Sequence, residues 1–242
     1  MLRKTSSDLH TLAPVPELLA RARAELPADF PAGRPTRVAR APGRLDVMGG
    51  IADYTGSLVC EMPLDRAAAV ALRPRDDRTV QVFSFNLLDE HKPFTLRIPL
   101  DALASQPTGV LRRGFAEPGR QWAGYVAGCL HALHRRGLVD LSAPAATGVN
   151  LALLSTVPLG AGVSSSAAIE VATMSALVDH FGIARGAESD AGSTGPVVTP
   201  MRLAALCQQV ENDVVGAPCG IMDQAASVYG RAGMLMRMTC QP

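Results

Sequence analysis

The chain has 242 residues, of which 48% are hydrophobic and 19% are charged, and its formal net charge is +1. This length suits one large domain or two small ones, and the composition excludes a disordered tail, a collagen-like repeat and an acidic solvating segment. The near-neutral charge argues against nucleic acid as the main partner. Only Lys4 and Lys92 are lysines, so a phosphate-handling mechanism that needs a lysine has almost no place for one.

The cysteines and the hydropathy predict a soluble, cytoplasmic protein. The five cysteines form neither a CxxC pair nor a Cys/His cluster with zinc-like spacing, which is typical of reduced, mostly buried thiols. The N-terminus has no apolar run of signal-peptide length. No segment approaches the roughly 20 apolar residues that a membrane span needs, so we expect no membrane partner.

Strands are expected to dominate the first half of the chain. Residues 1–36 are interpreted as an N-terminal appendage that holds a short amphipathic helix over Val15–Leu26, ended by a Pro/Gly-rich segment. From Arg37 the pattern changes to short extended segments, with a helix at Gln121–Leu138, where apolar residues recur at helical spacing. The expected strands start at Arg37, lie on either side of Pro63, and cover residues 79–85 and Pro93–Leu100.

Helices are expected to dominate the second half. The apolar run Gly148–Leu154 predicts a buried strand, and residues 164–181 are apolar nearly all round, which predicts a central helix. The small polar residues 184–199 are interpreted as a mobile loop. Two further helices are expected at Met201–Asp213 and residues 221–229. Strands followed by helices favour the α+β class over a doubly wound sheet.

A glycine- and serine-rich segment, Pro158–Ala168 (PLGAGVSSSAA), joins the buried strand to the central helix. Its glycines permit a tight turn, and its serines fall in the first helical turn, where free N–H groups and the positive helix end attract anions. An ordinary glycine turn with a serine N-cap has the same pattern. A Walker A loop lacks its lysine here, a dinucleotide fingerprint needs glycine where Ser165 stands, and the protein-kinase motifs are absent.

Two more segments concentrate charged residues. Arg40–Tyr54 carries Arg44, Asp46 and Asp53 among glycines, in what we expect to be a loop between strands. In the second segment, a helix ends near Glu211, a Gly/Pro loop follows, and Asp223 falls in the first turn of the next helix, where the helix dipole favours a carboxylate. Taken singly, a charged turn or a helix cap explains each of these residues.

In this order the three segments together resemble the GHMP family of small-molecule kinases, and within it the galactokinase-like sugar kinases. The resemblance runs from about Arg37 to Tyr229. APGR…GxxxDY is similar to the sugar-binding signature of the family, PLGAGVSSSAA to its phosphate loop, and VGAPCGIMDQ to the segment that holds its catalytic aspartate. The wording of residues 43–59 is most similar to L-arabinokinases.

The resemblance implies a two-layer α+β GHMP-kinase N-terminal domain (a ribosomal-protein-like βαβ fold) over residues 37–230. Residues 231–242 are then expected to begin a C-terminal domain that is largely missing. The implied activity is ATP- and Mg²⁺-dependent phosphorylation of the anomeric hydroxyl of a monosaccharide. L-Arabinose is the expected sugar and a galactokinase is the alternative. A sugar- and ATP-binding regulator without catalysis is the alternative from another class, and the oligomeric state is left open.

The resemblance also implies roles for individual residues. Asp223 would act as the general base or orient the sugar hydroxyl, and Arg44 would stabilise charge at the reacting centre. Ser166 and Glu211 would bind Mg²⁺. The ATP phosphates would lie on Gly160, Ala161, Gly162, Val163, Ser164, Ser165, Ser166 and Ala167, and the sugar on Arg44, Gly50, Asp53, Gly220 and Asp223.

One departure from the galactokinase pattern bears on the sugar. Galactokinases usually carry Glu-His where this chain has Gly50 and Ile51. L-Arabinopyranose has the ring stereochemistry of D-galactopyranose but lacks the hydroxymethyl group. Because Gly50 and Ile51 offer no charged partner for that hydroxyl, the sequence predicts a preference for the pentose.

Overall fold

The structure is a computed structural model that describes residues 9, 11–50, 52–187 and 197–240. Six strands form one mixed sheet in the order β1-β2-β5-β3-β4, with β8 on the free edge at the start of β2. Only β3 and β5 pair in parallel within it. The strands are β1 (Arg37–Met48), β2 (Leu58–Pro74), β3 (Thr79–Ser84), β4 (Thr95–Pro99), β5 (Val149–Ser155) and β8 (Met236–Thr239).

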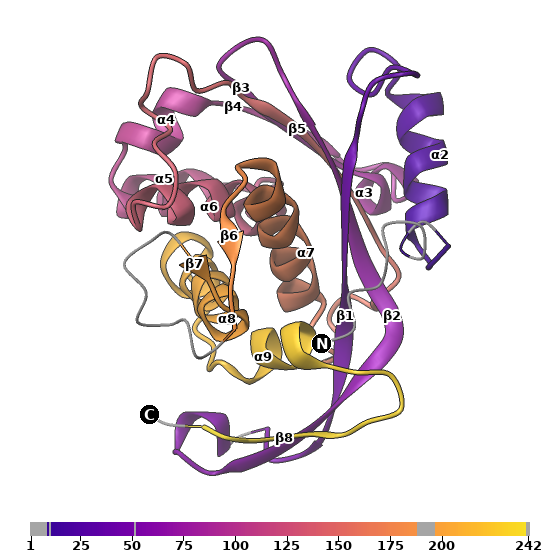
Figure 1. Ribbon diagram of the computed structural model, residues 1–242, viewed down its shortest axis with the longest axis vertical. Helices are drawn as coiled ribbons and strands as arrows, with labels where there is room; N and C mark the ends of the chain where they lie inside the picture. Colours follow the sequence, from indigo (N-terminus) through magenta and orange to yellow (C-terminus); the bar gives the residue numbers. More distant parts are fainter. Residues whose placement is uncertain (1–8, 10, 51, 188–196, 241–242) are drawn as a thin grey trace.

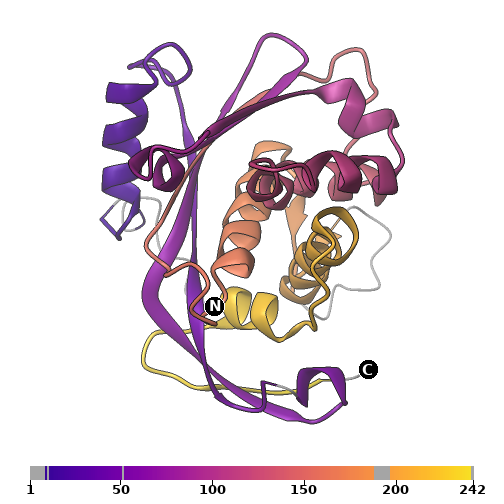
Figure 2. The ribbon, with the colours of Figure 1, turned by 180° about the vertical axis from the view of Figure 1, so that it is seen from behind.

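Helices cover both faces of the sheet (Figures 1 and 2). On one face lie α6 (Gln121–Arg135), α7 (Ser165–His180), α8 (Pro200–Gln209) and α9 (Met222–Tyr229), and on the other α2 (Val15–Glu25) and α3 (Phe85–Asp89). The predicted α+β class is confirmed, and α2 and α3 add cover on the second face of the sheet. The remaining elements are η1 (Ala52–Tyr54), α4 (Leu100–Ser105), α5 (Thr108–Phe115), η3 (Val210–Val215), β6 (Ala184–Arg185) and β7 (Val197–Val198).

The most apolar segments form the centre, as predicted. Every residue of β5 is buried, because β2 and β3 flank it and helices cover both of its faces. The central helix α7 lies against β1, β2, α6, α8 and α9, which explains why its apolar residues are not confined to one side. The five cysteines are free thiols and three of them are buried. Within the described residues, no helix is both long and apolar enough to cross a membrane.

The expected loop at residues 40–54 is wrong as far as Met48, where β1 ends, and the expected strand break at Pro63 is wrong. One strand, β1, runs through Arg44 and Asp46 to Met48, and β2 continues through Pro63. On its other edge, β2 pairs with β8 up to Glu61 and with β5 from Ala68 onward. Pro63 lies between these two ladders, so its missing N–H interrupts neither of them. A bulge in β1 just before Arg44 adjusts the register opposite the proline.

The expected helix at Met201–Asp213 changes its winding part-way. It begins as α8, where Thr199 caps the N–H of Arg202, and continues as the π-helix η3, which ends at Gly216 with a φ of +81°. Isolated π-turns of this kind occur frequently at functional sites. The wider turn matters here because it carries Glu211.

Several segments outside the expected elements also form helices or strands. The helices α3, α4 and α5 and the strand β8 were not predicted. The expected loop at 184–199 is wrong at both ends, where β6 and β7 pair in parallel around the buried Val198; residues 188–196 lie outside the described residues. Helix α2 packs Val15 and Leu18 against the sheet, and β8 pairs with β2, while the domain boundaries after residues 36 and 230 remain predictions.

Candidate active site

Arg44 connects all three charged or glycine-rich segments. From β1, its Nη2 and Nε donate to Asp223 Oδ1 at 2.6 and 3.0 Å, and its Nη1 donates to the carbonyl oxygen of Gly162 at 2.6 Å. Its backbone N–H donates to the carbonyl oxygen of Val163 at 3.1 Å. Arg44 is 7% exposed, whereas the Asp223 side chain is 26% exposed. The guanidinium is therefore fixed, and the carboxylate keeps an open side.

The glycine-rich segment forms an open turn before α7. Gly160 and Gly162 both have φ of +69°, and a Cβ on either would meet no atom within 4 Å. Glycine is required there by the backbone angle and not by lack of room. Ser164, the N-cap of α7, also has a positive φ of +58°, and its side chain makes no capping hydrogen bond. The serine N-cap alternative is therefore wrong at this position, and the first N–H groups of α7 remain available to an anion.

Ser166 and Glu211 lie side by side, although they are far apart in sequence. Burial raises the pKa of Glu211, and a hydrogen bond from Ser166 opposes this shift. The Glu211 Oε2 atom also accepts from Gln224 Nε2 at 2.8 Å. A hydroxyl and a carboxylate beside this glycine-rich turn fit Mg²⁺, which is usually held by one or two protein oxygens together with substrate phosphates. No group of three or more His, Cys, Asp or Glu residues suited to a metal occurs among the described residues.

Glu170 is a buried acid that the sequence analysis missed. It lies on α7, fully buried, and its Oε2 accepts from the same Gln224 amide at 3.2 Å. Burial and the nearby Glu211 raise the pKa of Glu170 well above its usual range. An acid in the middle of a mostly apolar helix was the available signal, because such residues are rarely buried without a partner.

The side of the site opposite the glycine-rich turn is formed by Asp53, Gly220 and Asp223. Asp53 Oδ2 accepts from the backbone N–H of Met222 at 3.1 Å and so caps the start of α9. A Cβ on Gly220 would collide with that same carboxylate, so any other residue there would displace Asp53. Asp53 Oδ1 is buried and has no hydrogen-bond partner among the described residues. An unsatisfied acceptor at this place is available to a ligand hydroxyl.

Gly50 packs against Asp46. A Cβ on Gly50 would collide with Asp46 Oδ2, so the Asp46 carboxylate takes up the space beside residue 50. Ile51, the other position of the departure from the galactokinase pattern, lies outside the described residues. Opposite Asp46 on β2 stands Glu61, which is fully buried.

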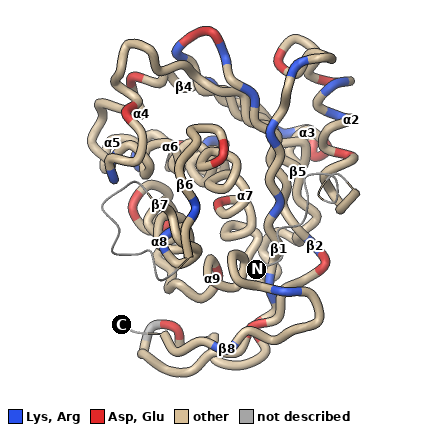
Figure 3. Tube along the Cα trace, viewed as in Figure 1, with Lys and Arg blue, Asp and Glu red and all other residues tan. Residues whose placement is uncertain are grey.

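Glu61 is a second residue that the sequence analysis missed. Its Oε2 lies 3.2 Å from Arg44 Nε, an ion-pair contact without hydrogen-bond alignment. Burial raises the pKa of Glu61 to about 8 against the opposing effect of Arg44, with Asp46 and Asp223 adding to the rise. Figure 3 shows the acidic positions on α7, α9 and β2 in red and the basic positions of β1 in blue.

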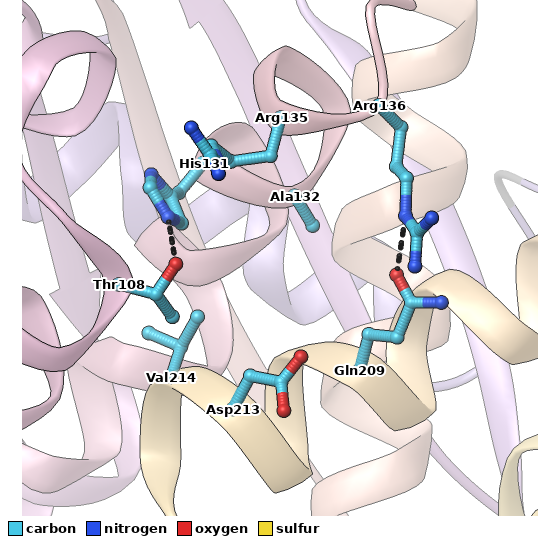
Figure 4. A pocket seen from close by; sticks show the side chains of 8 residues that line it. All are labelled: Thr108, His131, Ala132, Arg135, Arg136, Gln209, Asp213 and Val214. Atoms are coloured by element: carbon cyan, nitrogen blue, oxygen red, sulfur yellow. Dashed lines mark hydrogen bonds between the residues drawn. The ribbon is translucent and has the colours of Figure 1, made fainter.

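A surface cavity of about 250 Å³ lies elsewhere (Figure 4). It opens between α6 and η3, where His131 contacts Thr108 and Arg136 donates to Gln209. None of the predicted site residues lines it. The cluster around Arg44 is therefore the candidate active site, and it lies where α7, α9, β1 and β2 converge.

Sequence comparisons agree with this geometry. The profile of the GHMP kinases N terminal domain matches residues 124–231, and the galactokinase galactose-binding signature matches residues 28–74. The chain is 39% identical over 231 residues to L-arabinokinase of Arabidopsis thaliana, covering 85% of this chain and 21% of that protein. It is 37% identical over 212 residues to galactokinase of Chloroflexus aggregans, covering 86% of this chain and 44% of that protein.

Solved structures of other kinases have a similar fold. The crystal structure of Lactococcus lactis galactokinase complexed with galactose superposes with a TM-score of 0.70 at 23% identity, covering 92% of this chain and 49% of that one. The Methanococcus jannaschii mevalonate kinase superposes with a TM-score of 0.61 at 16% identity, covering 86% of this chain and 55% of that one. The chain spans less than half the length of the two sugar kinases it matches in sequence.

The fold, the glycine-rich turn before α7 and the matching profile define a GHMP kinase N-terminal domain in this chain. Residues 28–74, which precede that domain match, carry the galactokinase galactose-binding signature.

Proposed function

We propose that the chain forms the ATP- and sugar-binding part of a sugar 1-kinase. The observation that carries the proposal is the Arg44 guanidinium, which holds Asp223 on one side and the phosphate-loop carbonyl of Gly162 on the other. This arrangement sets a partly exposed carboxylate beside an anion-binding helix end. Phosphoryl transfer needs mostly positioning and electrostatic stabilisation, and these groups supply both without a lysine.

In the proposed reaction, the anomeric hydroxyl oxygen of the sugar forms a bond to the γ-phosphorus of ATP as the bond to the β,γ-bridging oxygen breaks. Asp223 orients that hydroxyl and accepts its proton, and ADP leaves. Arg44 offsets the negative charge of the transferred group and keeps Asp223 in place. The residues 160–167 hold the phosphates through backbone N–H groups at the start of α7.

Ser166 and Glu211 are the residues proposed to hold Mg²⁺. Bound there, Mg²⁺ would neutralise charge on the ATP phosphates. The Gln224 amide orients the Glu211 carboxylate from behind. The hydrogen bond between Ser166 and Glu211 supports this pair, because a shared metal needs both side chains close together.

The proposed sugar is L-arabinose, bound among Arg44, Gly50, Asp53, Gly220 and Asp223. The similarity to the Arabidopsis thaliana L-arabinokinase and the glycine at position 50 support a pentose. The second candidate is galactose, which is favoured by the galactose-binding signature over residues 28–74 and by the galactokinase relatives. We place the enzyme in the cytoplasm.

A coupled assay of ADP release tests the proposal on the full-length protein with a panel of free monosaccharides. Sugar-dependent ADP release, with phosphate recovered on the anomeric oxygen, is the expected result. Binding of ATP and sugar without turnover would instead identify a non-catalytic regulator on the same fold. The panel includes L-arabinose and D-galactose, so the same experiment separates the two candidate sugars.

A further inference from the structure

Arg44 contacts two carboxylates, and the proposed function uses only one of them. Its Nε atom donates to Asp223 Oδ1 at 3.0 Å and lies 3.2 Å from Glu61 Oε2. The Glu61 side chain is completely buried, and neither of its oxygens has a hydrogen-bond partner among the described residues. A buried acid with so little compensation is costly unless it holds a proton or a partner.

Asp46 stands directly opposite Glu61 in the β1–β2 ladder. Asp46 Oδ1 is likewise buried without a hydrogen-bond partner among the described residues. Two acids that face each other in this way are satisfied when one proton lies between them, because the protonated acid donates to the ionised one. The two acids together with Arg44 and Asp223 then carry a net charge of −1, and loss of the shared proton would make it −2.

We propose that Glu61 is a positioning residue for Arg44: protonated and paired with Asp46, it packs against the guanidinium without competing with Asp223 for it. The inference rests on the proposed function, because it assigns Arg44 and Asp223 to the reacting centre. Ionised Glu61 would be a second anion at the Nε edge of the guanidinium. It would draw Arg44 away from Asp223 and weaken the charge that Arg44 offers to the transferred phosphoryl group.

The groups around Glu61 indicate the pH at which it loses its proton. Among the described residues, the charged and titratable groups that act on it are Arg44 and Asp46 from β1, Asp223 from α9, and Cys240 after β8. Burial raises the pKa of Cys240 to about 12, so this thiol stays neutral. Burial also raises the pKa of Glu61 to about 8. Glu61 is therefore mainly neutral at pH 7 and becomes charged above about pH 8.

The test compares the full-length wild-type protein with Glu61→Gln, which keeps the size of the side chain and remains neutral at every pH. In the wild type we expect kcat to fall about tenfold as pH rises through 8 towards 10, an effect equivalent to one pKa unit of interaction. In Glu61→Gln the basic limb should be absent. Asp65→Asn is the matched control, because Asp65 lies on the same strand with its side chain 92% exposed; it should keep the wild-type profile.

A second readout does not depend on turnover. The Nε–H resonance of Arg44, followed by NMR, should shift with a midpoint near pH 8 in the wild type and in Asp65→Asn, and should stay constant in Glu61→Gln. An Arg44 resonance that does not titrate near pH 8 in the wild type, or titrates equally in Glu61→Gln, overturns the inference. If such a protein still phosphorylates a sugar, only the inference about Glu61 fails and the proposed function stands. If Arg44 titrates as expected but the protein phosphorylates no sugar, only the proposed function fails.

Discussion

The two walls of the candidate active site are built in different ways. The wall proposed to bind phosphate (the phosphate wall), residues 158–167, consists of one continuous turn and the start of α7, and it presents backbone groups. The wall proposed to bind the sugar (the sugar wall) consists of side chains from β1, η1, β2 and the loop before α9. These segments are closely packed: a Cβ on Gly50 would displace Asp46, and a Cβ on Gly220 would displace Asp53. The first wall is local and open, whereas the second is assembled from distant segments and tightly packed.

This difference has a physical cause and a practical consequence. Phosphate is recognised by N–H groups at a helix end, and any short segment with the right turn provides them. A sugar is recognised by hydroxyl-specific acceptors at fixed positions, which need several rigid elements to hold them. We therefore expect changes in the phosphate wall to alter nucleotide and metal binding, and changes in the sugar wall to alter turnover, sugar preference and folding together.

The largest effect is expected where the walls meet, at Asp223. Asp223→Asn keeps the size and the hydrogen bond to Arg44 but cannot accept a proton. Turnover should fall about 100-fold or more while ATP binding persists. Steady-state kinetics together with nucleotide titration measure both quantities. Near-normal turnover would remove Asp223 from the reaction and leave the two walls without a shared catalytic group.

The next effect concerns the proposed metal site, which joins the phosphate wall, through Ser166, to Glu211 on η3. Glu211→Gln removes one of the two proposed metal ligands, and the Mg²⁺ concentration for half-maximal activity should rise at least about tenfold, the smaller end of what loss of a supporting ligand costs. Asp213→Asn is the matched control, because Asp213 lies on the same π-helix and is exposed. An unchanged Mg²⁺ requirement in Glu211→Gln would contradict the assignment of the metal to Ser166 and Glu211.

The sugar wall should decide which sugar is used. We expect L-arabinose to exceed D-galactose by at least about tenfold in kcat/KM, because a missing charge-assisted hydrogen bond to the hydroxymethyl group is worth about 1.5–3 kcal/mol. Equal or better use of galactose refutes this pocket argument.

The reverse change sharpens the same prediction. Gly50→Glu with Ile51→His should move the preference towards galactose. Because a Cβ at residue 50 collides with Asp46 Oδ2, the shift should be larger when Asp46→Ala is added, which makes room for the new side chain. Asp46→Ala by itself is the control, and a preference for galactose in that single variant would assign the effect to Asp46 instead of residue 50.

The smallest expected effect concerns folding. Asp53→Ala removes the carboxylate that caps α9 through Met222, which should lower the free energy of unfolding by about 1 kcal/mol, as for other lost N-caps. Asp53→Asn keeps an acceptor oxygen and should lose less. Urea unfolding of both variants makes the comparison. Equal stability of wild type and Asp53→Ala would show that this wall does not depend on the cap.

The sequence by itself determined the features that are local or periodic. The buried strand β5, the central helix α7 and the glycine-rich turn between them were predicted because their patterns are continuous along the chain. The order of the three charged or glycine-rich segments indicated the family, because this order can be read along the chain without knowing which residues touch in space. The glycines at 160 and 162 were recognisable because a positive φ strongly favours glycine.

Only the tertiary structure decided what those segments do together. Local patterns predicted a loop around Arg44 and a break at Pro63, but pairing across the sheet made continuous strands of both. Glu61 and Glu170 looked like isolated acids in apolar segments, and their meaning comes from the partners that the fold sets beside them: Arg44 and Asp46 for Glu61, and Gln224 for Glu170. Burial and electrostatic coupling depend on distances in space between residues that are far apart in sequence, so no local pattern could have specified them.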